Sequence, residues 1–419
     1  MRTVWKALAV WLAVLIFGLV SPAMAGVYTY SDVMIGGRSA QMGGAYTGVA
    51  EDGSAAYFNP AGLGQITTPS MSISANGLDI QTYTLEKRLF EQDLTFRSNA
   101  FYPSAWSVVQ SLGEYRLAFS AIVPSNLDVV STTNFKNVEL LPGQFFDVGL
   151  IDSRIKDRVY LIGPSLAYRI TPTLMVGATL YYWYGEALRE TTLFFGGANG
   201  QSQVGQFSRT STTTHGLLGQ IGFLAKPSER YAVGLLLRAP VPLNQMVKTD
   251  NQEYSFDATS GIFTNSFSQS ETNQSARRPP GATLGLALHP SLGRTFSFDL
   301  SYYGSAGYSV SSRQIDIRPV WNAAFGFEEV IRPKFPIRFG LYTNRSAAPR
   351  LNDRPTVQDD RVDSYGATLG AGYIDELSTF DVGMRYALGK GKTKDATTGE
   401  HFDVKSQVLT FFVSGSVLF

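Results

Sequence analysis

The sequence predicts an all-β protein: a transmembrane antiparallel β-barrel of about 14 strands, with an N-terminal hatch that plugs its lumen. Three observations lead to this prediction. The chain begins with an export signal, apolar and polar residues alternate along many long segments, and tight turns alternate with long polar connections. The composition agrees, because 16% charged residues is well below the roughly 25% of soluble domains, whereas glycine (41 residues) and aromatic residues (13%) are abundant.

Residues 1–25 have the form of a signal peptide. Arg2 and Lys6 precede an apolar run at residues 7–20, and the small residues at 23–25 form a cleavage site that would leave Gly26 first. The apolar run is shorter than the ~20 residues of a spanning helix, which disfavours a membrane anchor, and no long apolar run follows it. We therefore expect a multi-pass barrel in the lipid of a Gram-negative outer membrane.

The composition also argues against several classes of function. The chain has no cysteine, so disulfides, thiolate chemistry and cysteine metal sites are excluded. His215, His289 and His401 lie far apart, and no nucleotide-binding or catalytic motif occurs. The formal net charge is +1, with no basic patch. We expect no enzyme activity, no cofactor, no metal site and no nucleic-acid partner.

Alternation of apolar and polar residues identifies the strands. In TFSFDLSYY (295–303), Phe296, Phe298 and Leu300 lie on one face and Asp299 on the other. A soluble β-sandwich would alternate in the same way. The segments are long enough to cross a membrane as tilted strands, and aromatic residues gather near their ends, at 181–184 and 302–303, as in the interfacial girdles of barrels.

The turns give the strand count. Tight turns rich in Pro, Gly and Ser occur at 110–114, 170–173, 225–230, 289–294, 331–334 and 374–378. Each joins a descending to an ascending strand, and a first strand from near Pro69 and a last one ending at Phe419 bring the total to about fourteen. This count requires 318–330 to be a strand although its alternation is weak. Polar stretches are expected as long outer loops at 199–206, 249–266, 344–360 and 391–401.

Residues 26–68 do not alternate and are rich in Gly and Ala. A free periplasmic tail would expose their many apolar side chains, whereas a barrel of this size has a lumen to fill. Small residues let a plug pack closely against the wall, and Pro60 fixes a turn after Asn59, whose side chain can cap nearby backbone groups. We expect 26–68 to be the plug and 69–419 the barrel.

Residues 36–66, GGRSAQMGGAYTGVAEDGSAAYFNPAGLGQI, resemble the hatch signature of the FadL family (OMPP1/FadL/TodX-like), outer-membrane transporters of long-chain fatty acids and hydrocarbons. Residues 277–303, 334–344 and the final two hairpins resemble the family in order and spacing. The resemblance implies passive import of a hydrophobic small molecule, captured by outer loops and released by movement of the hatch. The gating residues would be Gly37, Arg38, Asn59, Pro60 and Ala61.

Pro124 lies midway along the predicted third strand. Proline cannot donate to a sheet ladder, so it marks a bulge or a local break. In the FadL family the third strand is kinked, which leaves a gap through which ligand passes sideways into the membrane. Ser125 and Asn126 follow here, where the family often has an aromatic residue and Gly. The alternative is that Pro124 ends the strand near the outer rim.

Several charged residues are predicted to face the lumen. They are Arg116, Arg238, Asp299, Arg338, Asp381 and Arg385. Ion pairs between wall and plug would explain them, and an inward arginine could equally hold a ligand carboxylate.

Two further partners follow from resemblance. The amphipathic last strand ends in Phe419, like the signal read by the barrel-assembly machinery. PorV-like proteins share a similar hatch, so the alternative function is an outer-membrane docking or shuttle protein of a secretion system.

Overall fold

The computed structural model describes residues 28–30, 33–89, 92–141, 144–197, 202–258, 260–274, 277–310, 313–354, 358–395 and 398–419. The predicted signal peptide lies outside the described residues.

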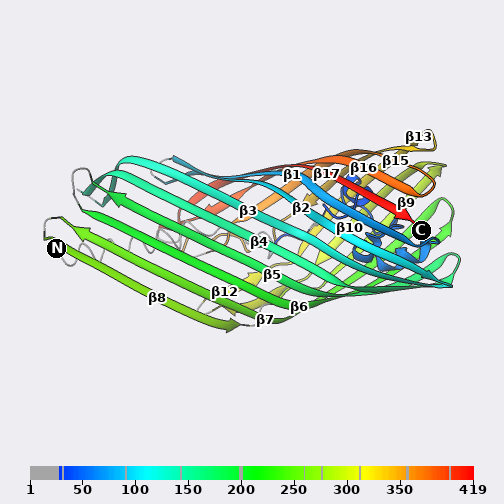
Figure 1. The fold of residues 1–419 in the computed structure, drawn as a ribbon, viewed down its shortest axis with the longest axis horizontal. Coiled ribbons are helices and arrows are strands. Elements are labelled where there is room, and N and C mark those ends of the chain that lie inside the picture. Colours follow the sequence, from blue (N-terminus) through cyan, green and yellow to red (C-terminus); the bar gives the residue numbers. More distant parts are fainter. Residues whose placement is uncertain are drawn as a thin grey trace.

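Within this part of the chain, fourteen antiparallel strands form a closed barrel, as predicted (Figure 1). The strands of the barrel are β1 (Ser70–Leu89), β2 (Gln92–Leu112), β3 (Tyr115–Leu141), β4 (Gln144–Thr171), β5 (Leu174–Gly196), β6 (Gln203–Ser228), β7 (Tyr231–Asp257), β9 (Gly281–Ser291), β10 (Arg294–Tyr303), β13 (Val320–Ile331), β14 (Phe335–Asn344), β15 (Arg361–Ile374), β16 (Ser378–Lys394) and β17 (His401–Leu418). The last strand pairs with the first, and pairing of β6 with β7 and of β7 with β9 completes the ring. Phe419 follows β17 and donates its backbone N–H to Pro69.

The strand boundaries confirm the turn analysis. All six predicted turns join consecutive strands, for example between β2 and β3 and between β9 and β10. The weakly alternating stretch 318–330 does form a strand, β13, because its neighbours on both sides pair with it in continuous register.

Three of the four predicted outer loops overlap strands. Residues 203–206 belong to β6, and most of 249–266 forms the end of β7 and the start of β8 (Ile262–Gln274), which pairs only with β7. The predicted loop 391–401 is also partly strand, because β16 continues to Lys394 and β17 starts at His401. Their polar composition suggested loops, but backbone pairing along a sheet does not require apolar side chains. β11 (Ala306–Val310) and β12 (Arg313–Ile317) form a separate hairpin.

The outer face of the barrel is apolar where its strands are shortest. Phe298, Leu300, Leu284 and Leu286 are exposed on β9 and β10, whereas Ser297 and Asp299 are buried inside. Closure of the barrel pairs its first strand with its last and leaves no free edge strand, so with an apolar exterior it spans the outer membrane of a Gram-negative bacterium.

The aromatic girdle prediction is only half right. Tyr182 and Tyr302 lie on the outer face, but Tyr181, Trp183 and Tyr303 are buried inside the barrel. Consecutive residues of a strand point to opposite faces, so a run of aromatic residues cannot lie on one face.

The helical elements are short and precede the barrel. They are α2 (Arg38–Gln41), α3 (Ala55–Phe58) and the 3₁₀ helix η1 (Pro60–Gln65). No helix among the described residues is both long and apolar enough to cross a membrane.

A charge placed on the outer face tests whether this face lies in hydrocarbon. We expect Phe298→Arg, in the middle of β10, to lower the free energy of unfolding by about 2–4 kcal/mol. Tyr302→Arg lies on the same face near the strand end and should cost only about 0–1 kcal/mol. Urea unfolding in lipid vesicles measures both values. Equal losses would contradict a membrane centred on this part of β10.

Candidate functional site

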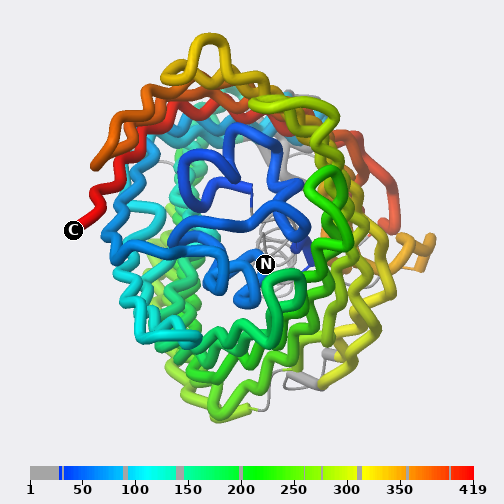
Figure 2. Tube along the Cα trace, turned by 90° about the vertical axis from the view of Figure 1, so that its right-hand side faces the viewer, coloured from blue at the N-terminus to red at the C-terminus, as the bar shows by residue number. Residues whose placement is uncertain are grey.

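The N-terminal segment, defined here as residues 33–66, lies inside the ring of strands (Figure 2). Its apolar side chains, among them Met42, Tyr46 and Leu63, are buried. They form one hydrophobic core with inward residues of the wall such as Val109 and Tyr181. Burial of apolar surface on both sides therefore holds the segment in the lumen.

The Asn59-Pro60 turn is fixed by its own side chain. The Asn59 side-chain oxygen accepts a hydrogen bond from the Ala61 N–H at 3.2 Å, and Pro60 opens η1. The amide nitrogen of Asn59 donates to the carbonyls of Thr47 (2.8 Å) and Phe223 (3.0 Å). Asn59 is fully buried. It therefore ties the turn both to the rest of the segment and to β6, as its capping potential predicted.

The wall carries glycine where the backbone of the segment touches it. A Cβ at Gly285 would lie 2.5 Å from the Gly48 nitrogen, and one at Gly234 would lie 2.1 Å from the Thr47 oxygen. Any larger residue would push the segment away from these strands. Six strands contribute such positions, namely Gly177, Gly222, Gly234, Gly285, Gly326 and Gly340. We call these residues the glycine seat.

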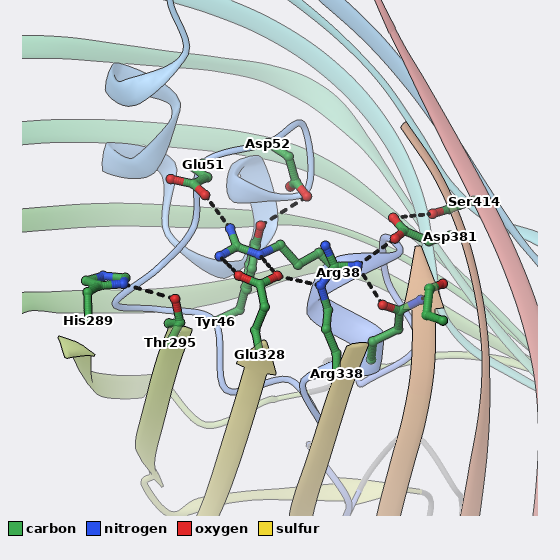
Figure 3. Close-up of polar contacts among 12 residues, drawn as sticks. Arg38, Tyr46, Glu51, Asp52, His289, Thr295, Glu328, Arg338, Asp381 and Ser414 are labelled. Carbon is green, nitrogen blue, oxygen red and sulfur yellow. Dashed lines mark hydrogen bonds and ion pairs between the residues drawn. The ribbon is translucent and has the colours of Figure 1, made fainter. Parts of the chain in front are cut away.

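A buried ion network joins the segment to the barrel (Figure 3). Both oxygens of Glu328 on β13 accept from Arg38, at 2.8 and 2.7 Å, and one also accepts from Arg338 on β14 at 2.5 Å. Arg338 donates further to Gln41 at 2.6 Å and to Asp381 at 2.5 Å. Each buried charge thus has an opposite charge beside it, which offsets its desolvation.

Arg38 also contacts the acidic residues of the segment itself. It pairs with Glu51 at 2.5 Å and lies over the Tyr46 ring, 5.7 Å from its centroid. The Tyr46 hydroxyl donates to Asp52 at 3.0 Å. Burial, with the nearby Asp52 carboxylate, raises the pKa of Tyr46 well above its usual range, so this hydroxyl stays a donor.

Most of the predicted inward charges contact the N-terminal segment. Asp299 accepts from the backbone N–H groups of Tyr46 (3.1 Å) and Thr47 (2.9 Å), and Arg116 donates to the Ile66 carbonyl. Arg338 contacts Gln41, as described above. The bonds of these residues fit the predicted role of holding the plug against the wall better than the predicted role of binding a ligand.

Arg385 and Arg238 line the two adjoining cavities described below, whereas Asp299, Arg338 and Asp381 line other cavities of the lumen. Arg385 bonds within the wall, to Thr410 at 2.8 Å and to Asp79 at 3.4 Å. Arg238 lies 4.5 Å from the centroid of the Tyr57 ring and donates to the Tyr57 hydroxyl and carbonyl, both at 3.3 Å. Gly37 packs tightly on β17, where a Cβ would clash with Ser414.

Sequence reasoning missed Glu328 and Arg278. Glu328 pairs in register with Arg338, so aligning the two strands about the turn at 332–334 would have found it. Arg278 precedes β9 and follows no pattern that marks it. Its guanidinium lies 4.3 Å from the centroid of the Trp183 ring. Within the described ranges, the guanidinium of Arg278 has neither a hydrogen-bond acceptor nor a carboxylate partner.

Two adjoining cavities lie next to the N-terminal segment in the lumen. The larger has a volume of about 280 Å³ and is lined by Met34, Val129 and Arg385, among others. The smaller has a volume of about 90 Å³ and is lined by Trp183, Leu161 and other mainly apolar residues. Four residues line both cavities, namely Tyr30, Pro124, Val159 and Arg278. The smaller cavity is mainly apolar and aromatic, whereas the larger is also lined by polar residues such as Gln81, Asn126 and Ser406. Both contain Arg278, which has no acidic partner among the described residues.

The barrel wall is interrupted beside these cavities. β3 pairs with β2 from Tyr115 to Ile122 and again at Val130, but residues 123–129 have no partner in β2. The register of β3 with β4 shifts between Ile122 and Ser125, so Pro124 lies in a bulge. The strand continues to Leu141, which overturns the alternative that Pro124 ends it near the rim.

Among the described residues, no group of three or more His, Asp or Glu side chains is placed to hold a metal ion. Arg238 and Arg385 make hydrogen bonds with the protein itself, whereas Arg278 contacts the ring of Trp183.

Several solved structures have a fold similar to that of this chain. The chain is similar to the Ralstonia pickettii toluene transporter TbuX, with a TM-score of 0.63 and 14% sequence identity over 92% of this chain and 99% of that one. It is similar to the P. putida toluene transporter TodX, with a TM-score of 0.64 and 14% identity over 92% of this chain and 99% of that one. It is also similar to a Pseudomonas aeruginosa FadL homologue, with a TM-score of 0.59 and 14% identity over 92% of this chain and 98% of that one. The resemblance to the FadL family is thus confirmed at the level of the fold. No protein-family model and no curated protein matches the chain.

Glu328 allows a direct test of the buried network. Glu328→Gln leaves Arg38 and Arg338 facing a neutral amide, and we expect the free energy of unfolding to fall by about 3–5 kcal/mol. The N-terminal segment should also become accessible to protease. Urea unfolding and limited proteolysis measure the two effects.

The neighbouring Glu329→Gln is the matched control, because Glu329 lies on the outer face and pairs with the exposed Arg294. It should change neither measurement. Equal effects of the two variants would show that the buried network does not hold the segment.

Proposed function

We propose that the protein is a passive outer-membrane transporter of long-chain fatty acids or similar hydrophobic compounds. The observation that carries this proposal is the pair of cavities next to the N-terminal segment, which combine apolar and aromatic residues with Arg278 and adjoin the wall interruption at Pro124. Among the described residues Arg278 has no acidic partner. Its larger cavity, about 280 Å³, is close to the lower end of the ~300–1,000 Å³ range of small-molecule sites. The related folds named as toluene transporters support a hydrophobic ligand.

The arginines of the site suggest a ligand with a carboxylate. Arg278 stacks on Trp183, which orients its guanidinium without neutralising it. Arg238 and Arg385 line the same pair of cavities. A carboxylate would supply the hydrogen-bond acceptor that Arg278 lacks, while its hydrocarbon chain would contact Trp183, Leu161 and Val159.

Ligand would leave the cavity through the wall at Pro124. Residues 123–129 of β3 and the facing part of β2 have unpaired edges, and they border the cavity at Pro124. A lateral route lets an apolar molecule pass into the membrane without crossing water. The gating role of Gly37, Arg38, Asn59, Pro60 and Ala61 belongs to the same proposal, and any such movement must break the bonds of Asn59 to Thr47 and Phe223.

Arg278 is the first residue to test. In cells that lack their own transporter, we expect Arg278→Met to weaken uptake of a labelled long-chain fatty acid by roughly tenfold at low concentration, because a hydrogen bond to a charged group is lost. Uptake of a labelled alkane of the same length should not change. Arg277→Met, at the adjacent exposed position, is the matched control.

The outcomes separate the ligand classes. Equal loss for acid and alkane would reject carboxylate recognition by Arg278. Absence of all uptake by a folded wild-type barrel would reject the transporter and favour the alternative, an outer-membrane docking protein.

The lateral route is tested by replacing Pro124 with a residue that has a backbone N–H. β2 and β3 keep the same register on both sides of the interruption, so we expect Pro124→Ala to extend their pairing and to reduce uptake of the same fatty acid severalfold, with binding to the purified protein retained. Pro164→Ala on β4, where Pro164 faces Phe119 in a continuous ladder, is the control and should leave uptake unchanged. Normal uptake after closure of the ladder would contradict a lateral exit here.

A further inference from the structure

A second interruption of the barrel wall lies along β7. The ladder of β7 with β9 ends at the pair Arg238–Gly281, and the ladder of β7 with β8 starts at Gln245 in the same register. Between the two ladders, residues 277–280 form no strand, and residues 239–242 of β7 have no partner on this side among the described residues. One edge of β7 is therefore unpaired here, although its other edge stays paired with β6.

Prolines lie on both edges of this interruption. In the register that the two ladders share, Pro240 on β7 is opposite Pro279, and one more proline follows on each edge. The interruption beside β3 has the same form, because the register of β2 with β3 places Pro103 opposite Pro124. Proline has no backbone N–H to donate to a neighbouring strand. At both interruptions, the facing positions thus lack the N–H donors of a ladder.

The smaller cavity connects the two interruptions. Its lining follows the order of the strands, from Pro124 on β3, past Trp183 on β5 and Leu218 on β6, to Pro240 on β7 and Pro279 beyond it. A single cavity of about 90 Å³ thus touches residues of both interruptions. A molecule held in this cavity lies next to two places where the wall has no ladder.

The outer face of β7 is apolar along the second interruption. Leu237 and Val241 are exposed on this face, whereas Pro240 points inward and lines the cavity. Apolar residues exposed on the outside of a barrel lie in the hydrocarbon of the membrane. Unpaired backbone groups are costly at this depth, so a continuous ladder would be more stable. The interruption therefore lies between the smaller cavity and lipid.

We propose that the interruption between β7 and β9 is a second lateral opening of the ligand site, through which hydrophobic molecules pass between the smaller cavity and the membrane. Pro124 and Pro240 then mark two parallel routes through the wall. The role of the second opening in uptake rests on the proposed transport function. Passage of a hydrophobic molecule from the membrane into the cavity does not, and it can be measured without uptake.

The tryptophans of the chain provide a reporter. Apart from the predicted signal peptide, the chain has only Trp106, Trp183 and Trp321. Trp106 and Trp321 are exposed, whereas Trp183 is buried and lines the smaller cavity. Trp106→Phe with Trp321→Phe gives a parent protein whose one remaining tryptophan lies in that cavity. In lipid vesicles, a long-chain bromoalkane dissolved in the membrane should quench its fluorescence, because bromine quenches tryptophan on contact.

A pair of cysteines closes the second opening. The chain has no cysteine of its own, so Pro240→Cys with Pro279→Cys gives two thiols at facing positions. Oxidation joins the two edges, and a methanethiosulfonate crosslinker joins them if the thiols do not oxidise. We expect a partial loss of the quenching rate relative to the parent protein. Addition of Pro124→Ala to the joined pair should abolish quenching, because both routes are then closed.

Leu237→Cys with Ala282→Cys is the matched control. These two residues face each other in the paired ladder next to the interruption. Joining them should leave the quenching rate unchanged, because the strands are already paired there. A heat-modifiability gel confirms that each barrel is folded.

Two results would overturn the proposal. One is a quenching rate equal to that of the parent protein after the pair at 240 and 279 is joined in a folded barrel. The other is complete loss of quenching with Pro124→Ala alone. Uptake of a labelled fatty acid by cells tests the transport function separately. Uptake with no effect of the joined pair on quenching rejects only the second opening, and absence of uptake with quenching that the joined pair slows rejects only transport.

Discussion

The backbone of the N-terminal segment touches the barrel wall with no side chain between them. This contact requires glycine on the wall, as at Gly234 and Gly285, because a Cβ there would overlap Thr47 or Gly48. The lumen keeps cavities beside the segment: the pair next to Tyr30 and Pro124 is the proposed ligand site, and another of about 350 Å³ lies next to Arg38 and Glu51. The same close contact buries Arg38, and the carboxylate of Glu328 offsets the free energy of desolvating the Arg38 charge.

The barrel combines two kinds of β-structure along one set of strands. In the membrane its exterior is apolar, whereas farther out the exterior carries charges that pair with one another, such as Arg154 with Asp128 and Lys156 with Glu186. The first part needs lipid and the second needs water, so this change fixes how deep the barrel lies in the membrane.

Much of this architecture was predictable from the sequence. Alternation and turn chemistry gave the strands, and even the weak strand β13 followed from the even number of strands. The bulge at Pro124 was predictable because proline cannot donate to a ladder, and Asn59 was predictable as a cap. The extended ends of β6 and β7 were missed, because their polar residues resemble a loop and only pairing with neighbouring strands makes them a sheet. The inward charges were correctly placed on the inner face, but their partners were not predictable, since Arg38 and Glu328 are 290 residues apart.

The sequence by itself determined which residues face inward and outward and where the chain turns. It also determined that the apolar side chains before the first strand are buried in the folded protein. These properties depend on local backbone periodicity and on the free energy of exposing apolar side chains to water. Only the tertiary structure decided which inward arginines are neutralised and that Arg278 has no acidic partner among the described residues. It also decided that apolar residues of eight strands meet in one buried cluster. These properties depend on distances between segments remote in sequence, which closure of the barrel around the N-terminal segment sets.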